Sequence, residues 1–212
     1  MSHNTLLGLP EFQGAVKPAS ALCYRTERAT WTYDALVGRL VELSGADAPA
    51  VLTFAIALVR DAQERREPTG WTTSEMSTFF PPDVAEHGVD LSALVVARVQ
   101  DKASVPRAAE ILVRSGAFGL VVLDLGDEAE IASALLSRLA KVAQQRETVV
   151  LCLTAKPSGT TSLNSLISLH GEARRIDTAT GLFRCELRIL KDKRRTPIWV
   201  HWENHHGPQG LR

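Results

Sequence analysis

Long apolar runs alternate with amphipathic segments along most of this chain. Residues 39–44, 118–125 and 148–153 are almost continuously apolar, a pattern typical of parallel strands that are covered on both faces. Residues 49–65 are apolar on most sides for three turns, and residues 129–145 carry an apolar stripe at helical spacing. The pattern therefore predicts buried strands separated by helices that pack on a sheet.

Weaker patterns fill in the rest of this alternation. They predict a short helix over 31–37, short strands over 71–73 and 94–99, and a helix over 104–114 that Ser115-Gly116 ends. Because strands and helices alternate, we expect the strands to run parallel and to be joined by right-handed crossovers.

The pattern changes after residue 154. A loop is predicted over 156–162 and a short helix over 163–170, followed by strands over 174–176, 182–190 and 197–202 that alternate like antiparallel hairpins. In the second of these strands, Phe183, Cys185, Leu187 and Ile189 are expected on one face, and Arg184, Glu186 and Arg188 on the other. The predicted fold class is therefore α/β, with a mostly parallel sheet flanked by helices and finished by antiparallel strands.

The composition is that of an ordinary globular protein. A length of 212 residues is enough for one domain with a sizeable core. The chain is 45% apolar and 23% charged, which is usual for a globular protein. We expect a loosely ordered arm over 1–30, a core domain over 31–203 and a C-terminal tail over 204–212. Residues 1–13 show no signal-peptide pattern, and the apolar run over 48–59 is too short to span a bilayer, so a cytoplasmic protein is expected.

Charge and cysteine content narrow the function classes further. The formal net charge is zero, which excludes the global basic field that drives non-specific nucleic-acid binding. Cys23, Cys152 and Cys185 are far apart in the sequence, and the last two lie in strand patterns, so buried reduced thiols are predicted. The histidine-rich stretch HWENHH lacks an accompanying metal-ligand motif, so we expect a disordered or partner-binding tail and no metal site.

The turn after the first apolar strand has the outline of a phosphate-binding loop. Such a loop reads G-x-x-x-x-G-K-[ST] between a strand and a helix. Counted from Gly45, the second glycine is replaced by Ala50, the lysine by Val51 and the hydroxyl residue by Leu52. The residues that would hold phosphate and magnesium are therefore missing, and no cofactor is expected.

Four blocks in this chain resemble the RecA recombinase family, in that family's order. They are GRLVELSG (38–45), HGVDLSALVV (87–96), VRSGAFGLVVLDL (113–125) and LRILKDKRRTP (187–197). The resemblance implies a RecA-like core over roughly residues 36–202. It also implies that Asp124 occupies the position of a magnesium-linked aspartate, and that Glu75 falls near the position of the water-activating glutamate.

A RecA-like core without its lysine implies a pseudo-ATPase, because the cradle, lysine and magnesium hydroxyl act as a unit. Among degenerate RecA relatives, the chain resembles the ImuA group of the bacterial damage-inducible mutagenesis cassette. The resemblance implies no enzymatic activity and an accessory role in translesion synthesis, with an ImuB-like polymerase-family protein, RecA and a DnaE-type error-prone polymerase as partners. The RecA family has two DNA-binding loops. The resemblance implies that this chain has no room for the first loop and keeps only a short remnant of the second, over 156–162.

Other functions stay open from sequence. A SulA-type division inhibitor that binds FtsZ would share the same origin. A weak ATPase would use Asp124 and Glu75, although an aspartate at the tip of a strand also serves as a helix cap or turn former.

A local basic cluster offers a third alternative. Its members are Arg174, Arg175, Lys191, Lys193, Arg194 and Arg195. The cluster is either a solvated hairpin end or a patch for a phosphate backbone or an acidic partner face. The second possibility would make the chain a DNA-binding module.

Overall fold

The computed structural model describes residues 31–45, 50–77, 79–127, 130–177, 182–195 and 199–206. The helices are α1 (Tyr33–Leu36), α2 (Val51–Glu64), α3 (Pro81–Glu86), α4 (Val105–Ser115) and α5 (Ser133–Arg146), with single 3-10 turns at Leu91–Ala93 and Lys102–Ser104. The strands are β1 (Leu40–Ser44), β2 (Thr69–Ser74), β3 (Leu94–Val99), β4 (Leu120–Gly126), β5 (Val149–Thr154), β6 (Leu169–Asp177), β7 (Leu182–Asp192) and β8 (Val200–His206).

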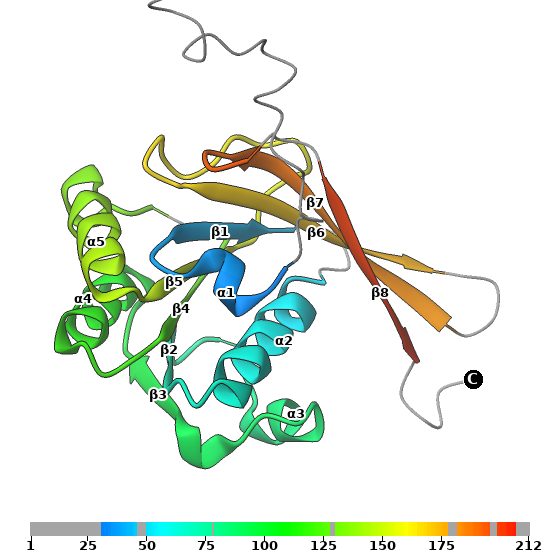
Figure 1. Cartoon of the computed structure of the whole chain (residues 1–212), viewed down its shortest axis with the longest axis horizontal. Helices are drawn as coiled ribbons and strands as arrows, with labels where there is room; N and C mark the ends of the chain where they lie inside the picture. Colours follow the sequence, from blue (N-terminus) through cyan, green and yellow to red (C-terminus); the bar gives the residue numbers. More distant parts are fainter. Residues whose placement is uncertain are drawn as a thin grey trace, which may run out of the picture.

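These strands form one sheet in the order β3-β2-β4-β5-β1-β6-β7-β8 (Figure 1). Each neighbouring pair from β3 to β6 is parallel, whereas β6–β7 and β7–β8 are antiparallel. The predicted fold class, a mostly parallel α/β sheet finished by antiparallel strands, is confirmed.

Helices cover the two faces of the parallel half. On one face, Phe54 and Leu58 of α2 lie in a core with Val41 and Leu43 of β1. On the other face, α4 and α5 form a second core with Val121, Leu123 and Leu125 of β4. The continuous apolar runs of the central strands are therefore explained by burial on both sides.

The antiparallel half extends beyond these helices (Figure 1). Along β7, Cys185, Leu187 and Ile189 are buried in the same core as α2, while Arg184 and Arg188 are exposed. The alternation expected from the sequence is confirmed, because one face of β7 packs and the other meets solvent.

A buried ion pair joins the two halves of the sheet. Arg39, just before β1, contacts Asp192 at the end of β7 at 2.5 Å, and both side chains are almost fully buried. Arg39 also donates to the hydroxyl and carbonyl oxygens of Ser168, at 3.0 and 2.9 Å. Burial lowers the pKa of Arg39, and the hydrogen bond and charge of Asp192 oppose that shift.

Two predicted elements differ from the structure. The helix predicted over 163–170 is wrong, because Asn164 forms a turn in which its side chain accepts from the Leu166 amide, and β6 then starts at Leu169. The helix predicted over 129–145 starts only at Ser133, because Ile131 packs against the core from the segment before the helix.

At the end of the described chain, β8 runs to His206, so residues 204–206 of the expected tail continue the last strand. The expected arm over 1–30, Cys23 and residues 207–212 lie outside the described residues. Cys152 and Cys185 are free and buried, as predicted. Within the described ranges, each helix is too short or too polar to cross a membrane.

Candidate functional site

The degenerate phosphate loop follows β1, at the carboxyl edge of the sheet. The Gly45 amide donates to the carbonyl of Thr154 at 3.2 Å, and residues 46–49 lie outside the described residues. Ala50 immediately precedes α2 and Val51 begins it, and these residues are only 2% and 7% exposed in the core beneath the sheet. Leu52 is 38% exposed. A packed apolar side chain, that of Val51, therefore fills the position that the lysine takes in a phosphate-binding loop.

Asp124, near the end of β4, also lies at the carboxyl edge of the sheet. Its Oδ2 accepts hydrogen bonds from the hydroxyls of Thr73 at 2.9 Å and Ser77 at 2.5 Å. Glu75 follows β2 and is exposed, and its amide donates to the carbonyl of Val99 at 2.9 Å. The carboxylate of Asp124 thus binds β2 and the turn after it, which is the structural role of an aspartate at a strand tip.

Sequence reasoning missed a buried carboxylate in the middle of β1. Glu42 is 0% exposed, and its Oε1 accepts from Lys156 Nζ at 2.6 Å and Thr154 Oγ1 at 3.1 Å. Its Oε2 accepts from the Leu163 amide at 2.6 Å. A glutamate inside the apolar run LVELS is the signal that could have found it, because buried carboxylates require partners.

A second buried polar pair lies beside Glu42. His170 of β6 is opposite Glu42 in the parallel register, and its Nε2 lies 2.8 Å from the hydroxyl of Ser44. Burial lowers the pKa of His170, Glu42 opposes that shift, and Lys156 adds to it. Burial, with the charge of Glu42, also raises the pKa of the Cys152 thiol. Since Ser44 and His170 are both buried, they support the sheet rather than face a substrate.

The segment over 156–162, expected as a remnant of a DNA-binding loop, is attached to the sheet at several points. Besides the Lys156 contact, the hydroxyl of Ser158 donates to Glu172 Oε1 at 2.5 Å. The Gly159 amide donates to Oε2 of the same carboxylate at 3.2 Å. The loop is therefore held by the carboxylates of Glu42 in β1 and Glu172 in β6.

The predicted basic cluster is divided along the β6–β7 hairpin. The backbone of Lys191 pairs with His170 at one end, whereas Arg174 pairs with Glu186, five residues back along β7. At about 3.4 Å per residue, that separation is roughly 17 Å. The six basic residues therefore do not form one continuous patch.

Several of these basic side chains already have partners. Lys191 Nζ donates to oxygens of residues 162, 164 and 165 at 3.2 to 3.4 Å, and burial followed by the charge of Lys193 lowers its pKa. Arg174 forms an ion pair with Glu186, and Arg194 donates to the carbonyl of Val37 at 3.2 Å. The guanidinium of Arg175 lies 3.8 Å above the ring of Phe183. Lys193 is exposed.

Metal-ligating side chains do not gather in the described part of the chain. His201 lies 3.1 Å from Glu203, but no group of three histidine, cysteine, aspartate or glutamate residues suited to a metal occurs among the described residues.

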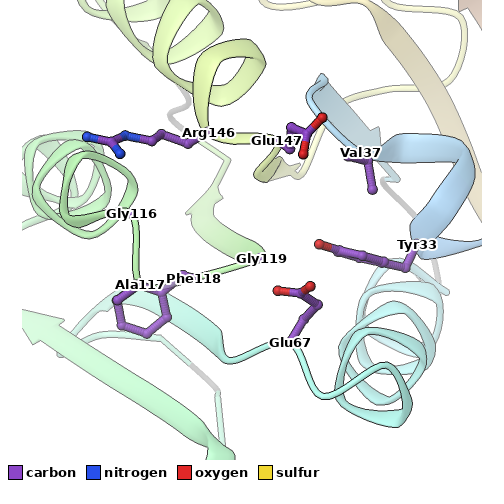
Figure 2. Close-up of a pocket in the computed structure, with 9 residues that line it drawn as sticks. All are labelled: Tyr33, Val37, Glu67, Gly116, Ala117, Phe118, Gly119, Arg146 and Glu147. Atoms are coloured by element: carbon purple, nitrogen blue, oxygen red, sulfur yellow. The ribbon is translucent and has the colours of Figure 1, made fainter.

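A pocket of about 340 Å³ opens at the opposite edge of the sheet (Figure 2). Its lining residues precede four parallel strands: Val37 before β1, Glu67 before β2, Gly119 before β4 and Glu147 before β5. Tyr33 of α1 closes one side. Sequence reasoning missed this pocket, because its residues come from four separate segments.

The fold and the sequence comparisons together support a relationship to RecA proteins. No family model matches the chain. The chain is 33% identical over 88 residues to a RecA protein of Nocardioides sp., 31% over 87 residues to that of Chlorobium chlorochromatii, and 29% over 87 residues to that of Bifidobacterium breve. Each match covers 41% of this chain, and the chain spans about a quarter of the length of these curated relatives, 22% to 25%.

Proposed function

We propose that this protein is a non-catalytic RecA-like accessory protein in SOS-induced translesion DNA synthesis. It acts in the cytoplasm as an adaptor that binds RecA and an ImuB-like polymerase-family protein, alongside a DnaE-type error-prone polymerase. The RecA-like fold, the partial similarity to RecA proteins and the resemblance to the ImuA group support this choice.

The packing of Ala50 and Val51 carries the non-catalytic part of this proposal. In a phosphate loop the lysine after the second glycine reaches the nucleotide, whereas here Val51 fills the core between α2 and the sheet. Asp124 remains at the strand tip, but its Oδ2 binds two hydroxyls of the protein itself. An adaptor needs the fold and its surfaces and does not need a nucleotide-binding site.

The outer face of the antiparallel extension offers a surface for a protein partner. Ile176 of β6 and Val200 and Trp202 of β8 are exposed large apolar residues on the two strands that flank β7, and Trp202 is 55% exposed. The cross-strand pairs place them on the same face as Arg184 and Arg188. The guanidinium of Arg184 lies 4.8 Å above the ring of Trp202. Tryptophan and arginine are among the residues most enriched at the centres of protein interfaces.

Nucleotide binding tests the non-catalytic part. The melting temperature of the purified protein is expected to be unchanged by ATP with magnesium, and hydrolysis is expected to stay at background. Saturable ATP binding at micromolar concentration would contradict this part and favour the weak ATPase that uses Asp124 and Glu75.

Capture experiments test the adaptor part. The tagged protein is expected to retain purified RecA and the ImuB-like protein, and not FtsZ. Trp202→Ala should reduce retention, whereas Ile111→Ala should not, because Ile111 is also apolar and exposed but lies on α4. Retention of FtsZ alone would instead identify a SulA-type division inhibitor.

A further inference from the structure

The pocket at the amino edge of the parallel strands is built to attract a cation. Helices α2, α4 and α5 all end beside it, since Glu67 follows α2, Gly116 follows α4 and Glu147 follows α5. Helix C-termini carry partial negative charge and favour positively charged groups. The carboxylates of Glu67 and Glu147 add two full negative charges at the same place.

The positive side chains near this pocket are directed elsewhere. Arg146 lines the rim, but its guanidinium points away from the centre and toward Gly116, where a Cβ would lie 3.4 Å from its Nη1 (Figure 2). Arg65, at the end of α2, forms ion pairs with Asp34 and Asp61. Arg194 donates to the backbone carbonyl of Val37 at 3.2 Å. Among the described residues, none of these three arginines forms an ion pair with Glu67 or Glu147.

A polar atom without a partner points into this space. The side chain of Tyr33 is only 5% exposed, and its hydroxyl faces the pocket in Figure 2. Within the described part of the chain this hydroxyl has no hydrogen-bond partner. Burial, followed by the charge of Glu67, raises the pKa of Tyr33 to about 12, so the phenol stays protonated at neutral pH.

Gly119 leaves room for this arrangement. A Cβ at Gly119 would lie 2.5 Å from Glu67 Oε2 and 2.6 Å from the Tyr33 hydroxyl. Any larger residue would therefore displace the two polar groups. The backbone amide of Tyr33 donates to Asp61 at 2.6 Å, and the Glu67 amide donates to the carbonyl of Ala62 at 3.1 Å, so both residues are held in place.

We propose that this pocket binds the guanidinium group of an arginine side chain presented by a partner protein. A planar guanidinium has five N–H donors, which suit two carboxylates and a phenol oxygen. The ring of Phe118 lines the same pocket and offers a surface on which a guanidinium stacks. A metal ion suits the pocket less well, since no three-residue metal group exists among the described residues.

This site lies at the edge opposite the degenerate phosphate loop, and it does not depend on the function proposed above. The pocket would bind an arginine whichever protein the chain serves. Failure of the adaptor proposal in capture experiments would leave the pocket untouched, and failure at the pocket would leave the adaptor proposal untouched.

Tyrosine NMR tests the proposal on the full chain. The sequence has two tyrosines, Tyr24 and Tyr33, so the Tyr24→Phe variant with ¹³Cζ-labelled tyrosine gives a single signal from the pocket. Acetyl-arginine amide is expected to shift this signal saturably, with a dissociation constant on the order of millimolar for one isolated residue. Acetyl-citrulline amide, its neutral isostere, should not shift it.

A variant of one pocket carboxylate and a control variant outside the pocket complete the test. In the Tyr24→Phe background, Glu67→Gln is expected to weaken binding about tenfold, since it removes a charged acceptor. Glu64→Gln removes an exposed carboxylate of α2 outside the pocket and should leave binding unchanged. Three results would each overturn the proposal: no saturable shift, equal shifts by the citrulline compound, or equal binding by Glu67→Gln and Glu64→Gln. Equal binding of acetyl-lysine amide would also overturn the choice of a guanidinium.

Discussion

Single residues at the start of α2 separate this chain from a nucleotide-binding protein. Val51 takes the position of the lysine and is buried, and its neighbour Leu52 is more than a third exposed. Restoring the lysine therefore means placing an ammonium group in an apolar core, where the charge has no partner. Return of ATP binding requires more than one substitution, because Ala50 and Leu52 also replace motif residues of the phosphate loop.

The substitution Val51→Lys is expected to lower the free energy of unfolding by about 3 kcal/mol, the cost typical of an unpaired buried charge. Leu52→Lys is the matched control, and its effect should stay within about 0.5 kcal/mol because the side chain reaches solvent. Urea denaturation measures both. Equal stability of the two variants would show that Val51 is not packed as described.

His170 is expected to make the protein less stable as the pH falls. Its pKa in the folded protein is lowered by burial from the ordinary 6.5, so the unfolded chain binds a proton that the folded chain does not. Below pH 6.5 stability is therefore lost as pH falls toward the folded pKa, with a slope of at most about 1.4 kcal/mol per pH unit. The charges around it are Glu42, Lys156, Glu172 and Lys191.

Urea denaturation of His170→Gln at pH 7, 6 and 5 should give a shallower loss of stability than the unchanged protein shows. His87→Gln is the control, because His87 is exposed at the end of α3 and its variant should follow the unchanged protein. Parallel pH profiles for the His170→Gln variant and the unchanged protein would contradict the prediction.

At the scale of elements, the most consequential contact is the Arg39–Asp192 pair that connects β1 to the end of β7. Among the residues that the structure describes, Asp192 Oδ2 has no hydrogen-bond partner, so removal of Arg39 leaves a buried carboxylate almost without compensation. Arg39→Met is expected to cost about 4 kcal/mol in the free energy of unfolding.

A second substitution checks the cause of this loss. The double variant Arg39→Met, Asp192→Asn should recover most of it, because the amide keeps an acceptor for the Arg194 amide, which lies 2.9 Å from Asp192 Oδ1. Chemical denaturation of the two single variants and the double variant gives the coupling energy. Additive losses would mean that the ion pair does not join the two halves.

Elements were predictable where the hydrophobic pattern and the segment length agreed. The runs that form β1, β4 and β5 are short and almost continuously apolar, which favours buried strands, and the apolar stripe of α5 recurs at helical spacing. The segment 163–170 was misread because Leu163, Leu166 and Ile167 fall at helical spacing. In the structure these residues reach the core from an irregular turn, and the Leu163 amide binds the carboxylate of Glu42, a contact 121 residues apart in sequence.

A candidate site was predictable from the sequence only where its residues lie in one continuous stretch. The degenerate loop lies in one continuous stretch, so the missing lysine could be read directly from the sequence. The pocket of Tyr33, Glu67 and Glu147 exists only after three helices have returned to the amino edge of the sheet. Charge runs were equally uninformative, because the hairpin places Arg174 and Lys191 far apart and gives both of them partners.

For the whole molecule, a net charge of zero and a divided basic cluster predict weak DNA binding. At physiological salt the dissociation constant for DNA should lie in the range of non-specific binding, about 10⁻⁴ to 10⁻⁶ M. The double variant Lys193→Ala, Arg195→Ala is expected to change this constant less than about threefold, as measured by fluorescence anisotropy. Tight binding with a steep salt dependence that this variant abolishes would favour the DNA-binding module.

Cys152 and Cys185 give the molecule two internal reporters of its own motion. Cys152 lies in the parallel half on β5, and Cys185 lies in the antiparallel extension on β7. A buried thiol reacts with an alkylating reagent only when its strand opens. With Cys23 replaced by serine, the alkylation rates of the two remaining thiols tell whether the extension detaches by itself or opens together with the rest of the sheet.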